Sequence, residues 1–333
     1  MQGKSTVNPE VDRPERKRMI SGRQMALQIT GFVIGIALLY LCIRTAWKTS
    51  GDWSALTEAS PSLIAALIGF GVLSTILDGF VFWAVLRPYQ RLNAGEVQGV
   101  NMTVALMNYA PIRLGTIFRV TYHARVDQVK LITIVGWFSV IIITTLACMA
   151  SVVAATLLSG GSMLGLALWM AGFLLASGIF LWFIARLGVV ERLGKGRERM
   201  LGDTRALAAG LVGRLLVLAS NTARMGLAAE ILDLDLGIRN VIILSVAALM
   251  LSFNPLGRVG WREWTLMMLT PYLAAEAFKG ESVEAMAAQL ALIESAGEFL
   301  AIIPFGVLTT AWALPRLIKG NREYRDRTKT VTD

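Results

Sequence analysis

The sequence predicts an all-α polytopic membrane protein with six full membrane spans and two re-entrant, broken helical hairpins. Of its 333 residues, 55% are apolar and only 17% are charged, whereas soluble domains carry about 25% charged residues. Six apolar stretches are long enough for the roughly 20 helical residues that cross a membrane. Two further apolar runs are shorter, and each is interrupted by Asn, Pro and Gly.

The six predicted spans alternate with polar loops. They are Met25–Ile43, Leu63–Leu86, Leu131–Leu158, Met163–Ile184, Ala206–Leu232 and Met286–Leu314. The first is longer than the roughly 7–15-residue core of a signal peptide, so we interpret it as a retained signal anchor. Basic residues concentrate in the N-terminal tail, in the loop from Arg186 to Arg205 and after Arg316. Because basic loops stay in the cytoplasm, we expect a multi-pass protein of the cell (inner) membrane with both termini cytoplasmic.

The two interrupted runs predict hairpins that enter the membrane without crossing it. Val97–Tyr109 and Val241–Phe253 are each 13 residues long, or about 20 Å of helix, against a hydrocarbon core of about 30 Å. Each is followed by a helix-breaking motif, Asn108–Gly115 or Asn254–Glu263. Unwound backbone at membrane depth is tolerated only where protein buries it or water reaches it. An alternative is that each hairpin is a pair of full spans, which gives ten crossings with unchanged orientation.

The order of these segments predicts two halves. Residues 25–158 and 159–315 each contain a span, a span, a hairpin and a span, flanked by basic tails at 1–24 and 316–333. Three crossings per half is an odd number, so the second half is expected to have inverted topology relative to the first. Inverted repeats with discontinuous helices are the architecture of many transporters.

The interrupted motifs are the predicted headgroup-binding site. Helices that restart after the breaks direct N–H groups and positive dipole ends toward an anion such as phosphate, and arginine forks match phosphate oxygens. The alternative is that these arginines lie at the interface and reach toward headgroups. The predicted binding residues are Asn108, Pro111, Arg113, Gly115, Arg119, Asn254, Arg258, Gly260, Arg262 and Glu263.

Charged residues inside the last two spans predict a charge-balancing group. Glu294 and Glu298 are four residues apart and share one helical face. Charge within a span is costly and therefore seeks a partner, so we expect either glutamate to neutralise Arg224, Arg258 or Arg262. A static structural ion pair is the alternative role.

Other function classes lack the residues that they need. The net charge of +9 arises from loops and tails, which argues against nucleic-acid binding. Cys42 and Cys148 lie in apolar spans and His123 is the only histidine, so we expect neither a metal site nor a disulfide. No nucleophile–base set or nucleotide-binding loop is evident, so we expect no enzyme activity and no cofactor.

Pro111-x-Arg113-x-Gly115 with Arg119, and the later Asn-Pro stretch ending in Gly260-x-Arg262-Glu263, resemble the two signature motifs of the lysylphosphatidylglycerol synthase transmembrane-region family, also described as flippase-like membrane proteins. The resemblance covers roughly residues 20–315 and implies a membrane-embedded lipid translocase module. Some members carry an added aminoacyl-transferase domain; the basic tail that ends at Asp333 leads us to expect a stand-alone member.

The sequence also departs from that family. Val135–Ser139 stands where the family often has an arginine and an acidic residue, Glu294 and Glu298 occupy the last span in place of a usual arginine, and Arg258 replaces a common glycine. We therefore expect a flippase-like protein that binds membrane lipids, either an anionic phospholipid or a polyprenyl-phosphate lipid. Two alternatives are a non-transporting partner of a lipid-modifying enzyme or glycosyltransferase, and an intramembrane enzyme acting on polyprenyl-phosphate lipids through Glu294 and Glu298.

Overall fold

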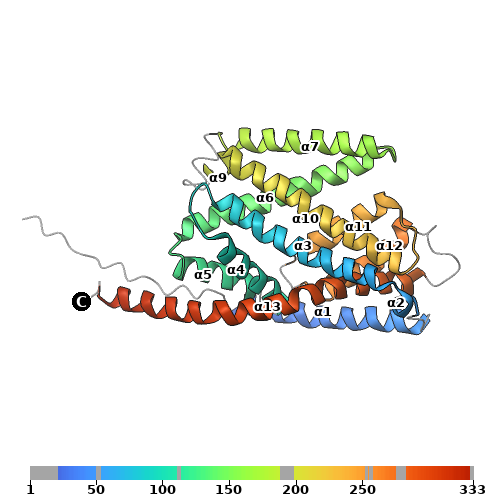
Figure 1. Ribbon diagram of the computed structural model, residues 1–333, viewed down its shortest axis with the longest axis horizontal. Coiled ribbons are helices and arrows are strands. Elements are labelled where there is room, and N and C mark those ends of the chain that lie inside the picture. Colours follow the sequence, from blue (N-terminus) through green and yellow to red (C-terminus); the bar gives the residue numbers. More distant parts are fainter. Residues whose placement is uncertain are drawn as a thin grey trace, which may run out of the picture.

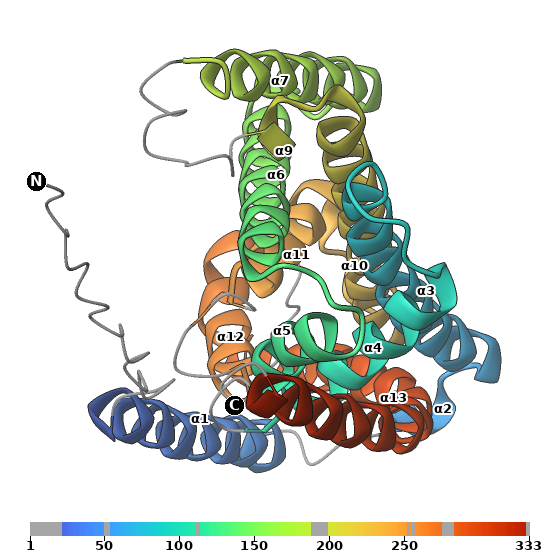
Figure 2. The same cartoon turned by 90° about the vertical axis from the view of Figure 1, so that its left-hand side faces the viewer.

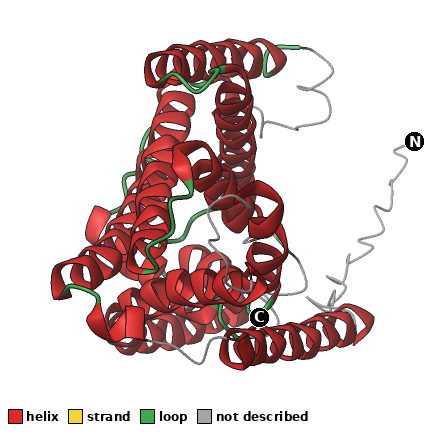
Figure 3. Cartoon of the chain, turned by 90° about the vertical axis from the view of Figure 1, so that its right-hand side faces the viewer, coloured by secondary structure: helices red, strands yellow, loops and turns green. Residues whose placement is uncertain are grey.

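The computed structural model describes residues 22–49, 54–110, 114–187, 199–251, 254, 258–274 and 283–330. These residues form helices joined by turns, without a strand among them (Figure 3). The helices are α1 (Gly22–Thr49), α2 (Ser54–Glu58), α3 (Pro61–Leu86), α4 (Ala94–Met107), α5 (Leu114–Arg125), α6 (Leu131–Leu158), α7 (Met163–Ile184), α9 (Arg199–Gly202), α10 (Thr204–Ile231), α11 (Gly237–Leu251), α12 (Trp261–Ala274) and α13 (Val283–Thr330). By length and composition, α1, α3, α6, α7, α10 and α13 can each cross a membrane, which confirms the six predicted membrane-length helices.

Local capping residues explain where several helices begin. Asn93 precedes α4 and its side-chain oxygen accepts a hydrogen bond from the Gly95 N–H at 2.8 Å. Asp203 does the same for α10, accepting from the Arg205 N–H at 2.8 Å. Such caps satisfy N–H groups that have no partner within the first helical turn.

Helices α3 and α10 lie side by side along much of their length (Figure 1). Helix α13 packs against α3 and α4, and α6 packs against α10 and α11. Helices α7 and α1 lie at opposite edges (Figure 2). Every residue of α7 remains at least partly exposed, which suits a helix that faces lipid.

Small residues allow α3 to approach α10 and α13 closely. A Cβ added to Gly213 of α10 would collide with Val81 of α3, and one added to Gly71 of α3 would lie 2.8 Å from the Ala301 Cβ of α13. Helices in membranes associate through this kind of backbone proximity, because lipid offers no hydrophobic driving force between them. The close packing of α3 with α10 and α13 therefore requires glycine at these two positions.

The two interrupted segments form pairs of short helices, α4–α5 and α11–α12. The loop before α4 meets the loop after α5, where the Gln90 side chain donates to the Asp127 carbonyl at 3.3 Å. Near the same end, the Tyr122 hydroxyl of α5 donates to Glu96 of α4 at 2.9 Å. The entrance and the exit of the α4–α5 pair therefore lie together.

The last helix differs from the sequence-based expectation, because α13 continues past the predicted end at Leu314 and through Pro315 to Thr330. Leu317 packs against the cluster that contains Phe118 and Tyr122, and Arg125 lies 3.3 Å from the centroid of the Tyr324 ring. These contacts hold the basic segment in helical form. The predicted tail at 316–333 is thus helical as far as Thr330, while residues 1–21 of the predicted N-terminal tail lie outside the described residues.

Candidate functional site

Five charged side chains from three parts of the bundle meet in one buried cluster, which we call the arginine cluster. Arg224 comes from α10, Arg258 from the turn before α12 and Arg262 from the first turn of α12. Glu294 and Glu298 come from α13, where their four-residue spacing places both on the face that meets α10 and α12.

Every member of the arginine cluster is ion-paired. Arg224 Nε and Nη2 donate to Glu294 Oε1 at 2.9 and 2.7 Å, and Nη2 also donates to Glu298 Oε2 at 2.8 Å. Arg262 Nη1 donates to Glu298 Oε2 at 2.5 Å, while its Nη2 donates to Glu294. Arg258 Nη2 donates to Glu298 Oε2 as well. One carboxylate oxygen of Glu298 is therefore shared by three guanidinium groups.

Burial makes this pairing necessary. The side chains of Arg224, Glu294 and Arg262 are only 2–3% exposed, whereas Arg258 is 20% exposed. Unpaired charges in such surroundings cost several kcal/mol, on the order of 3–5 kcal/mol for one that loses its partner. Arg258 is the most accessible of the three arginines, and it makes a single hydrogen bond within the cluster.

The turn that carries the second motif is fixed by a glycine and a glutamate. Gly260 has φ +79° and lies so close to the Gly35 carbonyl of α1 that a Cβ would overlap it. Glu263 accepts from the Gly260 N–H at 2.7 Å and from the Ser295 hydroxyl at 2.6 Å. The Trp261 indole N–H also donates to the Gly31 carbonyl at 3.0 Å. These contacts hold the start of α12 against α1 and α13.

A cavity of about 10 Å³ adjoins the arginines and is also lined by Asn221, Ser245 and Ala248. That volume accommodates about one water molecule. Arg224 Nη1 and Arg262 Nε are buried without a hydrogen-bond partner among the described residues. Within the ion-paired network three positive groups face two negative ones; with Glu263, which forms no ion pair to a described residue, the formal charges balance. The site thus combines unused N–H donors with nearly neutral total charge.

Tyr109 brings the first motif, Asn108–Gly115, next to the arginine cluster. Arg258 lies 5.8 Å from the centroid of the Tyr109 ring, and that ring contacts Phe299 of α13 at a centroid distance of 5.1 Å. Asn108 ends α4 and packs directly against Gly115, where a Cβ would collide with the asparagine side chain. Pro111 and Arg113 lie outside the described residues, whereas Asn254 is described but is not among the residues that line the cavity.

Arg119 belongs to a different polar group. It is 4% exposed, lies 3.5 Å from the centroid of the Phe82 ring and donates to the Asn101 side chain. Arg214 of α10, which pairs with Asp78 of α3, lies near the same ring. The structure therefore brings Arg258, Arg262 and Glu263 together with Arg224, Glu294 and Glu298, but separates Arg119 from them.

Two residues that contact the site, Tyr109 and Ser295, were not predicted as site residues from the sequence. Tyr109 approaches Arg258 across a separation of 149 positions, and Ser295 satisfies Glu263. The sequence does contain a signal for the bond from the Gly260 N–H to Glu263, because a glutamate at the third position of a helix commonly accepts from the backbone before it, but it contains none for the Ser295 contact. Comparison with family models, with curated proteins and with solved structures finds no match, so the site is interpreted from its own geometry and chemistry.

Proposed function

We propose that this chain is a lipid translocase that binds the phosphate of an anionic phospholipid or polyprenyl-phosphate headgroup at the arginine cluster. The observation that carries the proposal is the gathering of three arginines inside a bundle of membrane-length helices, with two buried N–H groups that have no described partner. Arginine forks bind phosphate oxygens through paired, charge-assisted hydrogen bonds.

Phosphate binding at this site requires an exchange of partners. The adjacent cavity holds about one water and is too small for a phosphate. Arg258 is partly exposed and is held by Glu298 alone among the carboxylates, so it is the group that can release a carboxylate and accept a phosphate oxygen. The N-terminus of α12, which begins at Trp261, adds further attraction for an anion.

The proposal includes two inverted halves, and helix packing supports it. In this assignment, each element of the first half has a counterpart in the second: α1 and α7, α3 and α10, α4–α5 and α11–α12, and α6 and α13. Several helix–helix contacts within or between the halves are then matched by a contact between the counterpart helices. Helix α6 packs on α7, α10 and α11, and α13 packs on α1, α3 and α4. Helices α3 and α10 are counterparts of each other and also pack together. Such matching is expected for two related halves around a pseudo-twofold axis.

The proposal also treats both short-helix pairs as re-entrant. Helices α4, α5, α11 and α12 contain 14, 12, 15 and 14 residues. At 1.5 Å per residue these are roughly 18–23 Å long, shorter than the ~30 Å hydrocarbon core. The meeting of the entrance and exit of α4–α5 at Gln90 and Asp127 supports the same reading.

Headgroup-dependent lipid translocation in proteoliposomes tests the proposal. We expect the wild-type protein to move labelled phosphatidylglycerol or a polyprenyl phosphate, and Arg258→Gln to slow this movement about tenfold, which corresponds to about 1.4 kcal/mol. Arg316→Gln is the matched control, because Arg316 is half-exposed and contacts Glu96 at 3.3 Å and the Trp312 ring at 4.2 Å, away from the arginine cluster. Absence of translocation by the wild-type protein, or equal rates for Arg258→Gln and wild type, would contradict the proposal.

A second candidate function is that of a non-transporting partner of a lipid-modifying enzyme or glycosyltransferase. The observation that favours it is the extension of α13 beyond the bundle as a charged helix, with Lys319 80% exposed (Figure 1). Co-purification with such an enzyme that persists in Arg258→Gln, together with no lipid movement, would favour this function over translocation.

A further inference from the structure

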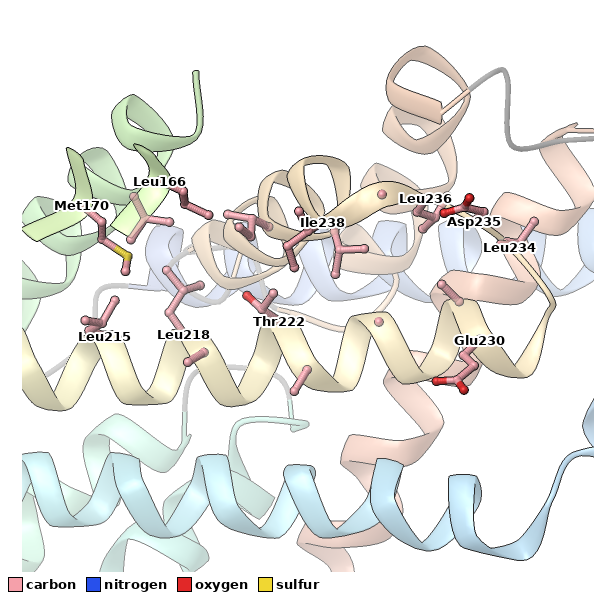
Figure 4. Close-up of a pocket in the computed structure, with 18 of the residues that line it drawn as sticks. Leu166, Met170, Leu215, Leu218, Thr222, Glu230, Leu234, Asp235, Leu236 and Ile238 are labelled. Carbon is pink, nitrogen blue, oxygen red and sulfur yellow. The ribbon is translucent and has the colours of Figure 1, made fainter. Parts of the chain in front are cut away.

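A second and much larger cavity lies between α6, α7, α10 and α11, away from the arginine cluster. It measures about 950 Å³, near the upper end of the roughly 300–1,000 Å³ found for ligand pockets. Its sides are apolar, with Leu166, Met170, Leu215 and Leu218 among the lining residues (Figure 4). We call this cavity the α7–α10 groove.

The groove is long enough for a lipid chain. Along α10 its lining runs from Leu215 to Glu230, which is about 22 Å at 1.5 Å per residue. One leaflet contributes about 15 Å of hydrocarbon depth, half of the ~30 Å core. Thr222 is the single hydroxyl among the described residues that line the groove, so its length offers packing for an alkyl chain and few polar contacts.

One end of the groove is acidic. Glu230 and Asp235 line it there (Figure 4), as does Asp233, and all three are exposed. None of the three forms an ion pair with a residue that the structure describes. Glu230 and Asp233 lie at the C-terminal end of α10, where the helix dipole disfavours negative charge. Glu230 and Asp233 therefore do not stabilise α10.

The same end also contains a feature that favours an anion. Helix α11 begins at Gly237, and both Gly237 and Ile238 line the groove. The free N–H groups of a helix N-terminus attract phosphate. Arg239, in the same turn, is exposed and adds positive charge outside the groove lining. Carboxylates and a helix N-terminus beside each other complement a headgroup that contains both an ammonium and a phosphate.

We infer that the α7–α10 groove binds an acyl chain of a zwitterionic phospholipid whose ammonium group contacts Glu230, Asp233 and Asp235. The apolar sides determine that the ligand is a lipid, and the charges at the end determine which headgroup is preferred. This site is independent of translocation, since a protein that retained such a lipid and moved none would still satisfy the inference.

Native mass spectrometry of the delipidated full chain with equal amounts of phosphatidylethanolamine and phosphatidylglycerol tests this inference. We expect at least about fivefold more bound phosphatidylethanolamine. The triple variant Glu230→Gln, Asp233→Asn, Asp235→Asn should remove that preference while leaving unselective lipid binding.

A matched pair of glycine variants tests the groove itself. Gly226 lines the groove and a Cβ there would meet only Val241, at 3.8 Å, so Gly226→Leu places a side chain at the groove lining with an unstrained Cβ. We expect it to reduce retention of phosphatidylethanolamine at least fivefold. Gly69→Leu is the control, because a Cβ on Gly69 of α3 would have no neighbour within 4 Å, and Gly69 does not line the groove.

Equal binding of the two lipids by the wild-type protein would overturn the inference, and so would unchanged retention of phosphatidylethanolamine in Gly226→Leu. Arg258→Gln distinguishes the two proposals, because it should lower translocation and leave the phosphatidylethanolamine preference intact. Loss of that preference in Arg258→Gln would assign it to the arginine cluster and also overturn the groove assignment.

Discussion

Replacing Glu294 with glutamine removes the charge of one of the two carboxylates in the arginine cluster. The side chain is 2% exposed and accepts three hydrogen bonds from Arg224 and Arg262. Glutamine has nearly the same shape, so the change leaves no cavity and isolates the loss of charge. Removing one partner of a buried pair costs about 3–5 kcal/mol, which is at least about a hundredfold in the unfolding equilibrium.

The free energy of unfolding in mixed detergent micelles, measured against denaturant concentration, provides the test. Glu323→Gln is the control, since its pair with Lys319 spans 3.9 Å at an exposed position and contributes about 1 kcal/mol or less. Asp78→Asn should fall between these two, because Asp78 pairs with buried Arg214 but is 31% exposed. A Glu294→Gln protein within about 1 kcal/mol of the wild type would refute the view that these charges are held as desolvated ion pairs.

Two further predictions concern Gly260, in the turn before α12, and the side of the membrane on which the two termini lie. Gly260→Ala should destabilise the protein by more than about 2 kcal/mol, because φ is +79° and the Gly35 carbonyl occupies the space of a Cβ. The control is Gly69→Ala, at an open helical position, which should be neutral or slightly stabilising. Equal unfolding free energies for the two variants would contradict the role assigned to Gly260. Reporter fusions should report cytoplasmic termini, as the basic loops predict; an active periplasmic reporter fused after residue 333 would contradict the proposed orientation.

The membrane-length helices could be predicted because they depend on local properties. Apolar runs such as Leu131–Leu158 and Met163–Ile184 have the helix bounds that their composition indicates. The end of α13 could not be predicted in this way, because the helix past Pro315 is held by packing of Leu317 and Tyr324 against residues far away in the sequence.

The charged residues illustrate the same limit. Spacing places Glu294 and Glu298 on one helical face, but the choice of partners depends on how α10, α12 and α13 pack. Arg214 pairs with Asp78 across 136 positions, because α3 packs against α10. The sequence could name the five members of the arginine cluster as candidates, but not that Glu298 pairs with all three arginines. It contained no signal for the Arg214–Asp78 pair.

The most direct measurement of the proposed function is an experimental structure in nanodiscs that contain phosphatidylglycerol or a polyprenyl phosphate. The proposal predicts a headgroup phosphate within hydrogen-bond distance of Arg258, with Arg224 Nη1 or Arg262 Nε as a second donor. An arginine cluster that keeps all its glutamate contacts under saturating lipid, with no phosphate near Arg258, would contradict it.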